Sequence, residues 1–145
     1  MDYLISHYNV VLECILEHIE LTLFALLISF VIAFPIGVLI SKCKILSGPI
    51  NGIFNTIYAI PSIALFSFLI PYTGIGTGTA IIAFVVYNQY MLVKSVEEGF
   101  DSISPAIYEI GKGLGYNKVS FFFSVELPLA LPSIVNGLKL ATIGT

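Results

Sequence analysis

The chain has 145 residues, of which 57% are hydrophobic and 10% are charged. Soluble globular domains carry about 25% charged residues, so this composition excludes an ordinary soluble domain. Six basic residues, all lysines, and nine acids give a net charge of −3, which excludes a basic nucleic-acid-binding protein. Two widely separated cysteines form neither a disulfide scaffold nor a metal-binding motif. The composition is that of a membrane protein.

The N-terminal third contains one amphipathic segment and one uncharged segment. In residues 1–20, apolar side chains recur at helical spacing and acids fall on another face. This pattern predicts an amphipathic helix that lies on the outer membrane face or extends the span after it. Residues 21–41 carry no charge and match the roughly 20 residues that a helix needs to cross the hydrocarbon. They are the first predicted span, and 42–49 are a predicted loop.

The next uncharged run is too long for one span. It holds 49 residues between Lys44 and Lys94 and contains a turn rich in proline, glycine and threonine. We therefore predict spans over 50–70 and 75–93, joined by an outer turn at 71–74.

Residues 94–126 are polar and contain signals for two short helices. Ser104 and Pro105 are typical of a helix start, and Gly115 suits the positive-φ position that ends a helix. Asn117 can cap a second short helix over 118–125, and Pro128 is expected to end it. We expect these two helices to form an elbow that packs on its own spans or docks in a groove of a soluble partner.

The last segment, 127–145, is predicted to begin a fourth span. Pro132 is followed by 13 residues, and these 14 residues would make about 21 Å of helix, against a hydrocarbon core of about 30 Å. The expected fold is thus an all-α integral membrane protein with three full spans and a partial fourth, and the chain is expected to end within that fourth span.

The lysines predict the orientation. Five of the six follow the first and third predicted spans, the sixth, Lys139, lies in the last segment, and none occurs in 1–41 or 45–93. The positive-inside rule then places 42–49 and 94–126 in the cytoplasm and the N-terminus outside.

The predicted complete spans contain no ionisable residue other than tyrosine and no serine beside a base. This argues against an enzyme and against a proton-coupled carrier, and we expect no metal site and no cofactor. Pro61 and the polar residues Ser62 and Asn88 are candidates for a translocation path, although Asn88 suits a helix-to-helix hydrogen bond better.

The polar loop resembles a known family at its motif residues. Glu109, Ile110 and Gly111 are followed by Gly115, and nine residues later by Val125, Glu126, Leu127 and Pro128. This spacing is similar to the cytoplasmic signature of permease subunits of binding-protein-dependent ATP-binding-cassette (ABC) importers. That signature reads Glu-Ala-Ala, three residues, Gly, nine residues, Ile, one residue, Leu-Pro. Here Ile110 and Gly111 replace the two alanines and Val125 replaces the isoleucine.

The resemblance extends along the chain. Residues 56–65 and 125–132 look most like the osmoprotectant branch, which imports glycine betaine, carnitine, choline or related quaternary amines. The resemblance implies the type I importer permease fold, with the elbow as a pair of coupling helices that sit in a cleft of the ATPase subunit. It also implies a second permease subunit, a separate extracytoplasmic binding protein and at least one further span. ATP would be bound by the ATPase, in a complex of the plasma (inner) membrane.

Two alternatives stay open. A methionine-type amino-acid importer permease shares the general plan, and a truncated chain could bind the ATPase without transporting anything. The resemblance places ligand capture on the binding protein, so the 13% aromatic content is assigned to packing and to lipid contact.

Overall fold

The computed structural model describes residues 8–145 and is helical, with no strand in this range. Its elements are α2 (Tyr8–Lys42), α3 (Lys44–Tyr58), α4 (Ser62–Thr73), α5 (Thr77–Asp101), α6 (Pro105–Gly113), α7 (Lys118–Phe121), a π-helical turn η1 (Phe122–Glu126) and α8 (Leu127–Gly144). The part of the predicted amphipathic helix that falls on residues 1–7 lies outside the described residues.

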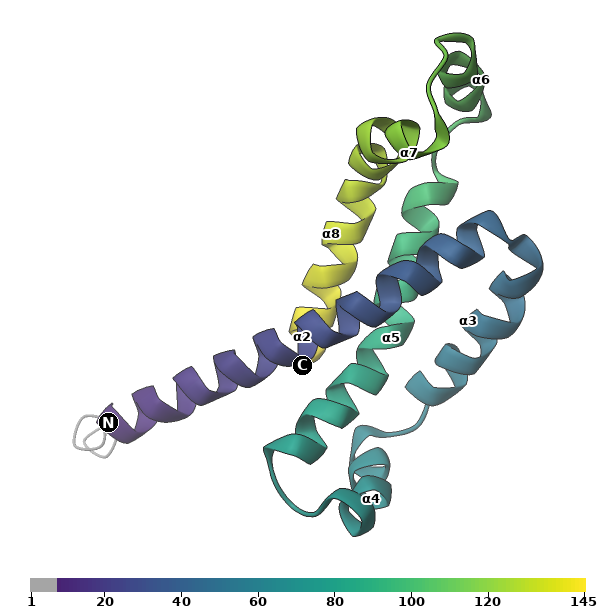
Figure 1. The fold of residues 1–145 in the computed structure, drawn as a ribbon. Coiled ribbons are helices and arrows are strands. Elements are labelled where there is room, and N and C mark those ends of the chain that lie inside the picture. The colour runs from purple at the N-terminus through teal and green to yellow at the C-terminus, as the bar shows by residue number, and fades with distance from the viewer. Residues whose placement is uncertain (1–7) are drawn as a thin grey trace.

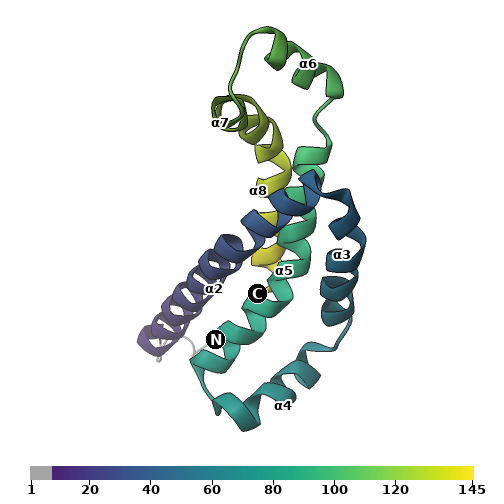
Figure 2. The same ribbon diagram turned by 45° about the vertical axis from the view of Figure 1, so that its right-hand side comes forward.

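Helix α5 is the central element. It packs against α2 and α8, while α3 and α4 run along its other side (Figures 1 and 2). Helix α6 lies at one end of the molecule and α4 at the other. One cluster of buried side chains joins α2, α5 and α8 near the middle, and a second lies toward α6; together they comprise Leu26, Ala33, Ile40, Leu92, Val93, Ala141, Val96, Phe100, Ile103, Ala130 and Ile134.

Glycines allow these helices to approach closely. A Cβ at Gly37 of α2 would lie 2.5 Å from the Cβ of Val96, and one at Gly137 of α8 would lie 2.4 Å from the Cβ of Ser95. At Gly99 of α5 it would lie 2.9 Å from the carbonyl oxygen of Ala130. Small residues at such contacts are a usual basis of helix packing in membranes, where van der Waals contact replaces the hydrophobic effect.

We expect Gly37→Leu to separate α2 from α5 and to lower the stability of the protein by about 1–3 kcal/mol, the range typical of overpacking. Thermal unfolding of the detergent-purified protein measures this. Gly48→Leu is the matched control, because a Cβ there meets no atom within 4 Å. Equal melting temperatures for the two variants would contradict the close approach of α2 to α5.

The N-terminal end agrees with one prediction and corrects another. Helix α2 runs unbroken through residues 20 and 21, where no glycine or proline interrupts it, so the amphipathic segment extends the first span, which is one of the two predicted arrangements. The predicted loop 42–49 is reduced to Cys43, and α3 starts at Lys44. Tertiary contacts stabilise this start: Ser47 donates a 2.5 Å hydrogen bond to the buried carboxylate of Glu97 on α5.

The span predicted over 50–70 is not one helix. Helices α3 and α4 meet at an angle of 89° around residues 59–61. Pro61 disfavours the helical conformation of Ile60 and provides the first turn of α4 with a fixed φ of −55°. Proline in a membrane helix therefore produces a full break here. Helix α4 then continues into the predicted turn 71–74 and ends at Thr73.

Predictions for the third span and the second short helix also need correction. Helix α5 begins at Thr77 rather than at residue 75 and continues past residue 93 to Asp101, so the connecting segment is shorter than 94–126. Pro128 does not end a helix, because α7, η1 and α8 form one continuous helical run, Lys118–Gly144. The amide of Leu127 donates to the carbonyl of Phe122, five residues back, and this π-turn comes just before the proline, which has no N–H to donate.

The described residues contain three helices that are long and apolar enough to cross a membrane, or up to four spans if the bent pair α3–α4 counts as one. The fold class, an all-α integral membrane protein, agrees with the prediction.

Candidate functional site: the elbow at the end of the bundle

Helix α6 has well-defined ends. The Ser104 hydroxyl accepts a hydrogen bond from the Ala106 amide, and Pro105 occupies the first turn. At the other end Gly115 has φ +77°, its amide donates to Lys112, and the amide of Tyr116 donates to Gly111. These two bonds form a Schellman motif, which requires a left-handed residue that glycine adopts at least cost. The sequence predicts both ends of α6 correctly.

The second arm of the elbow packs tightly on the first. The Asn117 side chain accepts from the Ser120 amide and caps α7. The ring of Phe121 lies between those of Tyr108 and Tyr116, with centroids 5.5 and 6.1 Å away. A Cβ at Gly111 would lie 2.2 Å from this ring. Glycine in place of the family's alanine thus makes room for the aromatic side chain.

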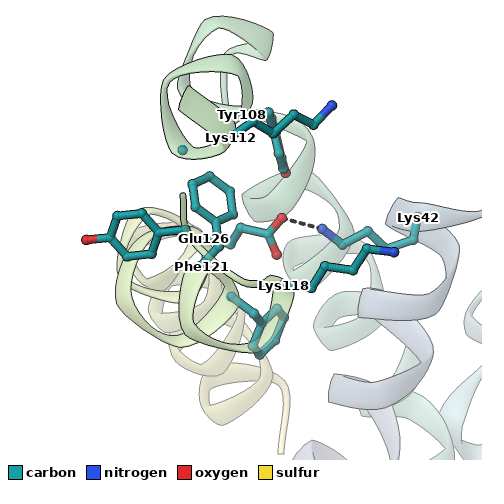
Figure 3. A pocket seen from close by; sticks show the side chains of 9 residues that line it. Lys42, Tyr108, Lys112, Lys118, Phe121 and Glu126 are labelled. Atoms are coloured by element: carbon teal, nitrogen blue, oxygen red, sulfur yellow. Dashed lines mark hydrogen bonds and ion pairs between the residues drawn. The ribbon is translucent and has the colours of Figure 1, made fainter. Parts of the chain in front are cut away.

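An ion pair connects the elbow to the bundle. The Nζ atom of Lys42, at the end of α2, lies 2.6 Å from Oε1 of Glu126, whose side chain is only 6% exposed (Figure 3). The same ammonium lies 5.4 Å from the ring centroid of Tyr108 and 5.8 Å from that of Phe100. A cavity of about 420 Å³ lies here, and its lining includes Lys42, Tyr108, Lys112, Lys118, Phe121 and Glu126. Lys42 therefore joins α2 to both arms of the elbow.

Burial of Tyr108, together with the negative charge of Glu126, raises the pKa of the Tyr108 phenol to about 12. Since the folded pKa lies above the ordinary value of 10, the neutral phenol contributes stability below pH 10, and this is lost as the pH rises toward 12. The phenol is therefore neutral throughout the physiological range.

The predicted coupling residues occupy three different settings. Glu109 and Ile110 of α6 are exposed, Gly111 is buried, and Gly115 is exposed with open space around it. Val125 and Leu127 are half-buried in the run from η1 into α8, and Pro128 is exposed. The same segment also exposes several large apolar side chains. We name five of them the elbow patch: Ile110, Leu114, Tyr116, Val119 and Phe123.

Two of the three candidate path residues, Pro61 and Ser62, lie at the break between α3 and α4, and the third, Asn88, lies on α5. Ser62 and Asn88 line one cavity, and Pro61 is the residue at which the chain turns into α4. Asn88 is 4% exposed and donates a 3.1 Å hydrogen bond to the hydroxyl of Thr145. This hydrogen bond joins α5 to the residue that follows α8, and the part that Asn88 plays in a path stays a prediction.

Sequence reasoning missed the Lys42–Glu126 pair and the ring contact between Tyr108 and Phe121. One signal was available: Glu126 is a single acid within an otherwise uncharged run from residue 119 to 138, so it needed a partner. Which of the six lysines would supply it follows only from the position of α2.

A family model described as "Binding-protein-dependent transport system inner membrane component" matches residues 19–145. The chain belongs to this family. It is 35% identical over 127 residues to the choline transport system permease protein OpuBB of Bacillus subtilis, covering 88% of this chain and 58% of that protein. It is 32% identical to the osmoprotectant import permease protein OsmW of Salmonella typhimurium, covering 99% and 69%. The chain thus spans about 58% of the length of its first relatives, which are named as transport permeases rather than as enzymes.

Solved structures agree on the fold. An inward-facing structure of the MetNI methionine ABC transporter matches with a TM-score of 0.74 and 27% identity over 86% of this chain and 64% of the matched chain. A second form of MetNI has a TM-score of 0.77, 26% identity and coverage of 90% and 67%. The chain has the type I ABC importer permease fold.

Proposed function

We propose that this chain is the membrane-spanning permease subunit of an ATP-driven importer of quaternary-amine osmoprotectants such as glycine betaine, carnitine or choline. In this proposal α6, α7 and the connecting turn dock in a cleft of an ABC ATPase, and ATP binds to that partner. A second permease subunit, identical or homologous, completes the path, and an extracytoplasmic binding protein delivers the substrate. The chain itself supplies no catalytic group.

The elbow patch is the observation that carries the proposal. Five large apolar side chains stand 44–71% exposed on α6, α7, the turn that joins them and the start of η1, at one end of the bundle. Exposed apolar side chains concentrated on one segment mark an interaction site. The Lys42–Glu126 pair and the Phe121 packing hold the patch on α2 and α8, so movement of a docked partner would be transmitted to the spans. A change in their packing would then alternate access to the path.

The proposed orientation follows from the lysines. Lys42, Lys44, Lys112 and Lys118 all belong to the elbow end of the molecule, which the positive-inside rule assigns to the cytoplasm. The N-terminal end of α2 and the turn between α4 and α5 would then face outward.

The substrate class is supported by the names of the relatives. Choline, carnitine, glycine betaine and osmoprotectant permeases match over 88–99% of the chain. The MetNI structures favour the alternative, a methionine-type importer, on fold. An ATPase-binding subunit without transport activity is the other alternative. A direct experiment separates the three.

We expect Leu114→Glu to abolish co-purification of the ATPase and to reduce uptake at least tenfold, because a carboxylate in a desolvated groove lacks a partner. Leu114 is 71% exposed, so folding should be unaffected. The measurement is tagged purification in mild detergent with uptake of labelled choline and labelled methionine. Ile75→Glu is the control, since Ile75 is 92% exposed at the opposite end of the bundle.

Each result supports one of the three proposed functions. Choline uptake that Leu114→Glu abolishes supports the proposal, methionine uptake alone supports the rival importer, and ATPase binding without uptake of either supports the non-transporting subunit. Full ATPase binding by the Leu114→Glu variant would contradict docking through the elbow patch.

A further inference from the structure

A second cavity, separate from the elbow, lies where the broken helix pair meets α5 and α8. It encloses about 180 Å³, and its lining includes Tyr58 at the end of α3, Ser62 at the start of α4, Tyr87 and Asn88 on α5, and Leu140 on α8. The 89° bend between α3 and α4 brings the first two of these residues to the same cavity. Broken membrane helices expose backbone and side chains that a continuous helix would turn to its neighbours, and such breaks accompany ligand sites in transporters.

Two of the eight tyrosines of the chain line this cavity, and a third, Tyr90, packs on one of them. The ring of Tyr58 stacks on that of Tyr90 with centroids 5.0 Å apart, and its centroid lies 5.7 Å from that of Tyr87 at an angle of 60°. Tyr58 and Tyr87 line the cavity, and Tyr58 keeps 38% of its surface exposed. The cavity wall thus contains two tyrosine rings, and aromatic π-faces are the groups that hold methylated ammonium ions.

Tyr87, which lines the cavity, has a hydroxyl that no contact within the described residues explains. It is buried and has no hydrogen-bond partner among the described residues. Buried polar atoms are nearly always paired, because an unpaired one loses its bonds to water without replacement. A ligand that brings an oxygen to the cavity would provide the missing partner.

The charge pattern selects a cation with apolar substituents. Among the described residues, no Asp, Glu, His or Lys lines the cavity. A primary ammonium, which needs several hydrogen bonds, would therefore find no carboxylate to pair with. The tyrosine rings present negative π-faces, and α3 ends at Tyr58, so the negative end of its helix dipole lies beside them. A quaternary ammonium, which has positive charge but no N–H group, fits these surroundings.

We propose that this cavity is a subsite in the permease for the quaternary ammonium group of the substrate. Tyr58 and Tyr87 supply the ring faces, and the Tyr87 hydroxyl donates to an oxygen of the same ligand. This inference rests on the proposed function and names the residues that would recognise its substrate within the membrane.

The first test is binding of choline to the complete permease–ATPase assembly in nanodiscs, without the binding protein. We expect saturable binding that is lost for the uncharged carbon isostere dimethylbutanol. Tyr58→Leu keeps an apolar side chain but removes the π-face, and should weaken choline about 3- to 30-fold. Tyr72→Leu is the matched control, since Tyr72 is a 78% exposed tyrosine on α4 outside the cavity lining, and it should bind choline as the wild type does.

A second variant guards against a folding defect. Tyr87→Phe removes only the unpaired hydroxyl and leaves the ring, so no existing hydrogen bond is broken. It should weaken choline about 2- to 10-fold, the loss of one hydrogen bond, and leave tetramethylammonium unchanged because that ion has no oxygen. Equal affinity of both variants and the wild type for choline, or equal binding of choline and dimethylbutanol, overturns the proposal.

Choline uptake by the whole importer tests the proposed function independently of the subsite. Choline uptake by an assembly that shows no saturable choline binding without the binding protein would overturn the subsite and leave the function standing. Absence of choline uptake by the wild-type assembly would overturn the function, and the affinities of Tyr58→Leu and Tyr87→Phe would still decide whether the cavity binds the cation.

Discussion

Gly115→Val is expected to abolish ATPase association and coupled uptake while leaving membrane insertion intact. Gly115 has φ +77°, and a left-handed backbone costs about 1–2 kcal/mol for a residue with a Cβ, with a further penalty for a β-branched one. No atom lies within 4 Å of the added Cβ, so the whole effect comes from backbone conformation. The turn would relax, the Schellman bonds to Gly111 and Lys112 would break, and the elbow patch would lose its shape.

Two other glycines provide controls for this variant. Gly113→Val lies two residues away with equally open surroundings but without a positive φ. Gly74→Val also places a β-branched residue at a strained positive φ, +79° with ψ −179°, at the opposite end of the molecule (Figure 1). Both should retain ATPase binding, as measured by co-purification. Normal uptake by Gly115→Val, measured beside its wild type, would disprove the assignment of the elbow as the coupling element.

Removal of the Lys42 ammonium should detach the elbow from α2. In Lys42→Met the carboxylate of Glu126, 6% exposed, remains buried without its cation. Loss of a partner costs 3–5 kcal/mol in a fully buried pair and about 0–1 kcal/mol at the surface. Because the Lys42 side chain is 45% exposed, we expect about 2 kcal/mol. Hydrogen exchange of α6 and α7 should become markedly faster, whereas exchange in the middle of α5 should not change.

The double variant Lys42→Met/Glu126→Gln tests the origin of the effect. It removes both charges, so the penalty of a buried unpaired carboxylate disappears and most of the protection of α6 and α7 should return. Lys44→Met is the control, because Lys44 pairs with Asp101 at a more exposed site. If the double variant exchanges as fast as Lys42→Met, packing by the lysine stem rather than the ion pair holds the elbow.

Local signals account for the parts of the candidate site that could be predicted. The ends of α6 depend on Ser104, Pro105 and Gly115, whose conformational preferences act within a few residues. The cap at Asn117 is equally local. The 89° bend at Pro61 is not predicted by the sequence. A proline in an apolar run predicts that a helix is disturbed, but it does not predict the angle between the two pieces.

Contacts between distant residues could not be read in the same way. Lys42 and Glu126 are 84 positions apart, and the pair exists because α2 passes beside the start of α8. Gly111 stands where the family signature has alanine, and only the tertiary structure explains this, because the ring of Phe121 occupies the space of a Cβ. The aromatic content by itself predicts packing and lipid contact, yet Tyr58 and Tyr87 meet at a cavity beside the bend.

The sequence by itself determined the membrane class, the helical content and the ends of α6, because hydropathy and capping act over one or a few turns of helix. Tertiary structure decided where α3 and α5 begin and end, that α7 continues through a π-turn into α8, and which charges and rings meet. Those features depend on the close approach of α2, α5 and α8 at Gly37, Gly99 and Gly137, and no pattern along the chain specifies which helix lies against which.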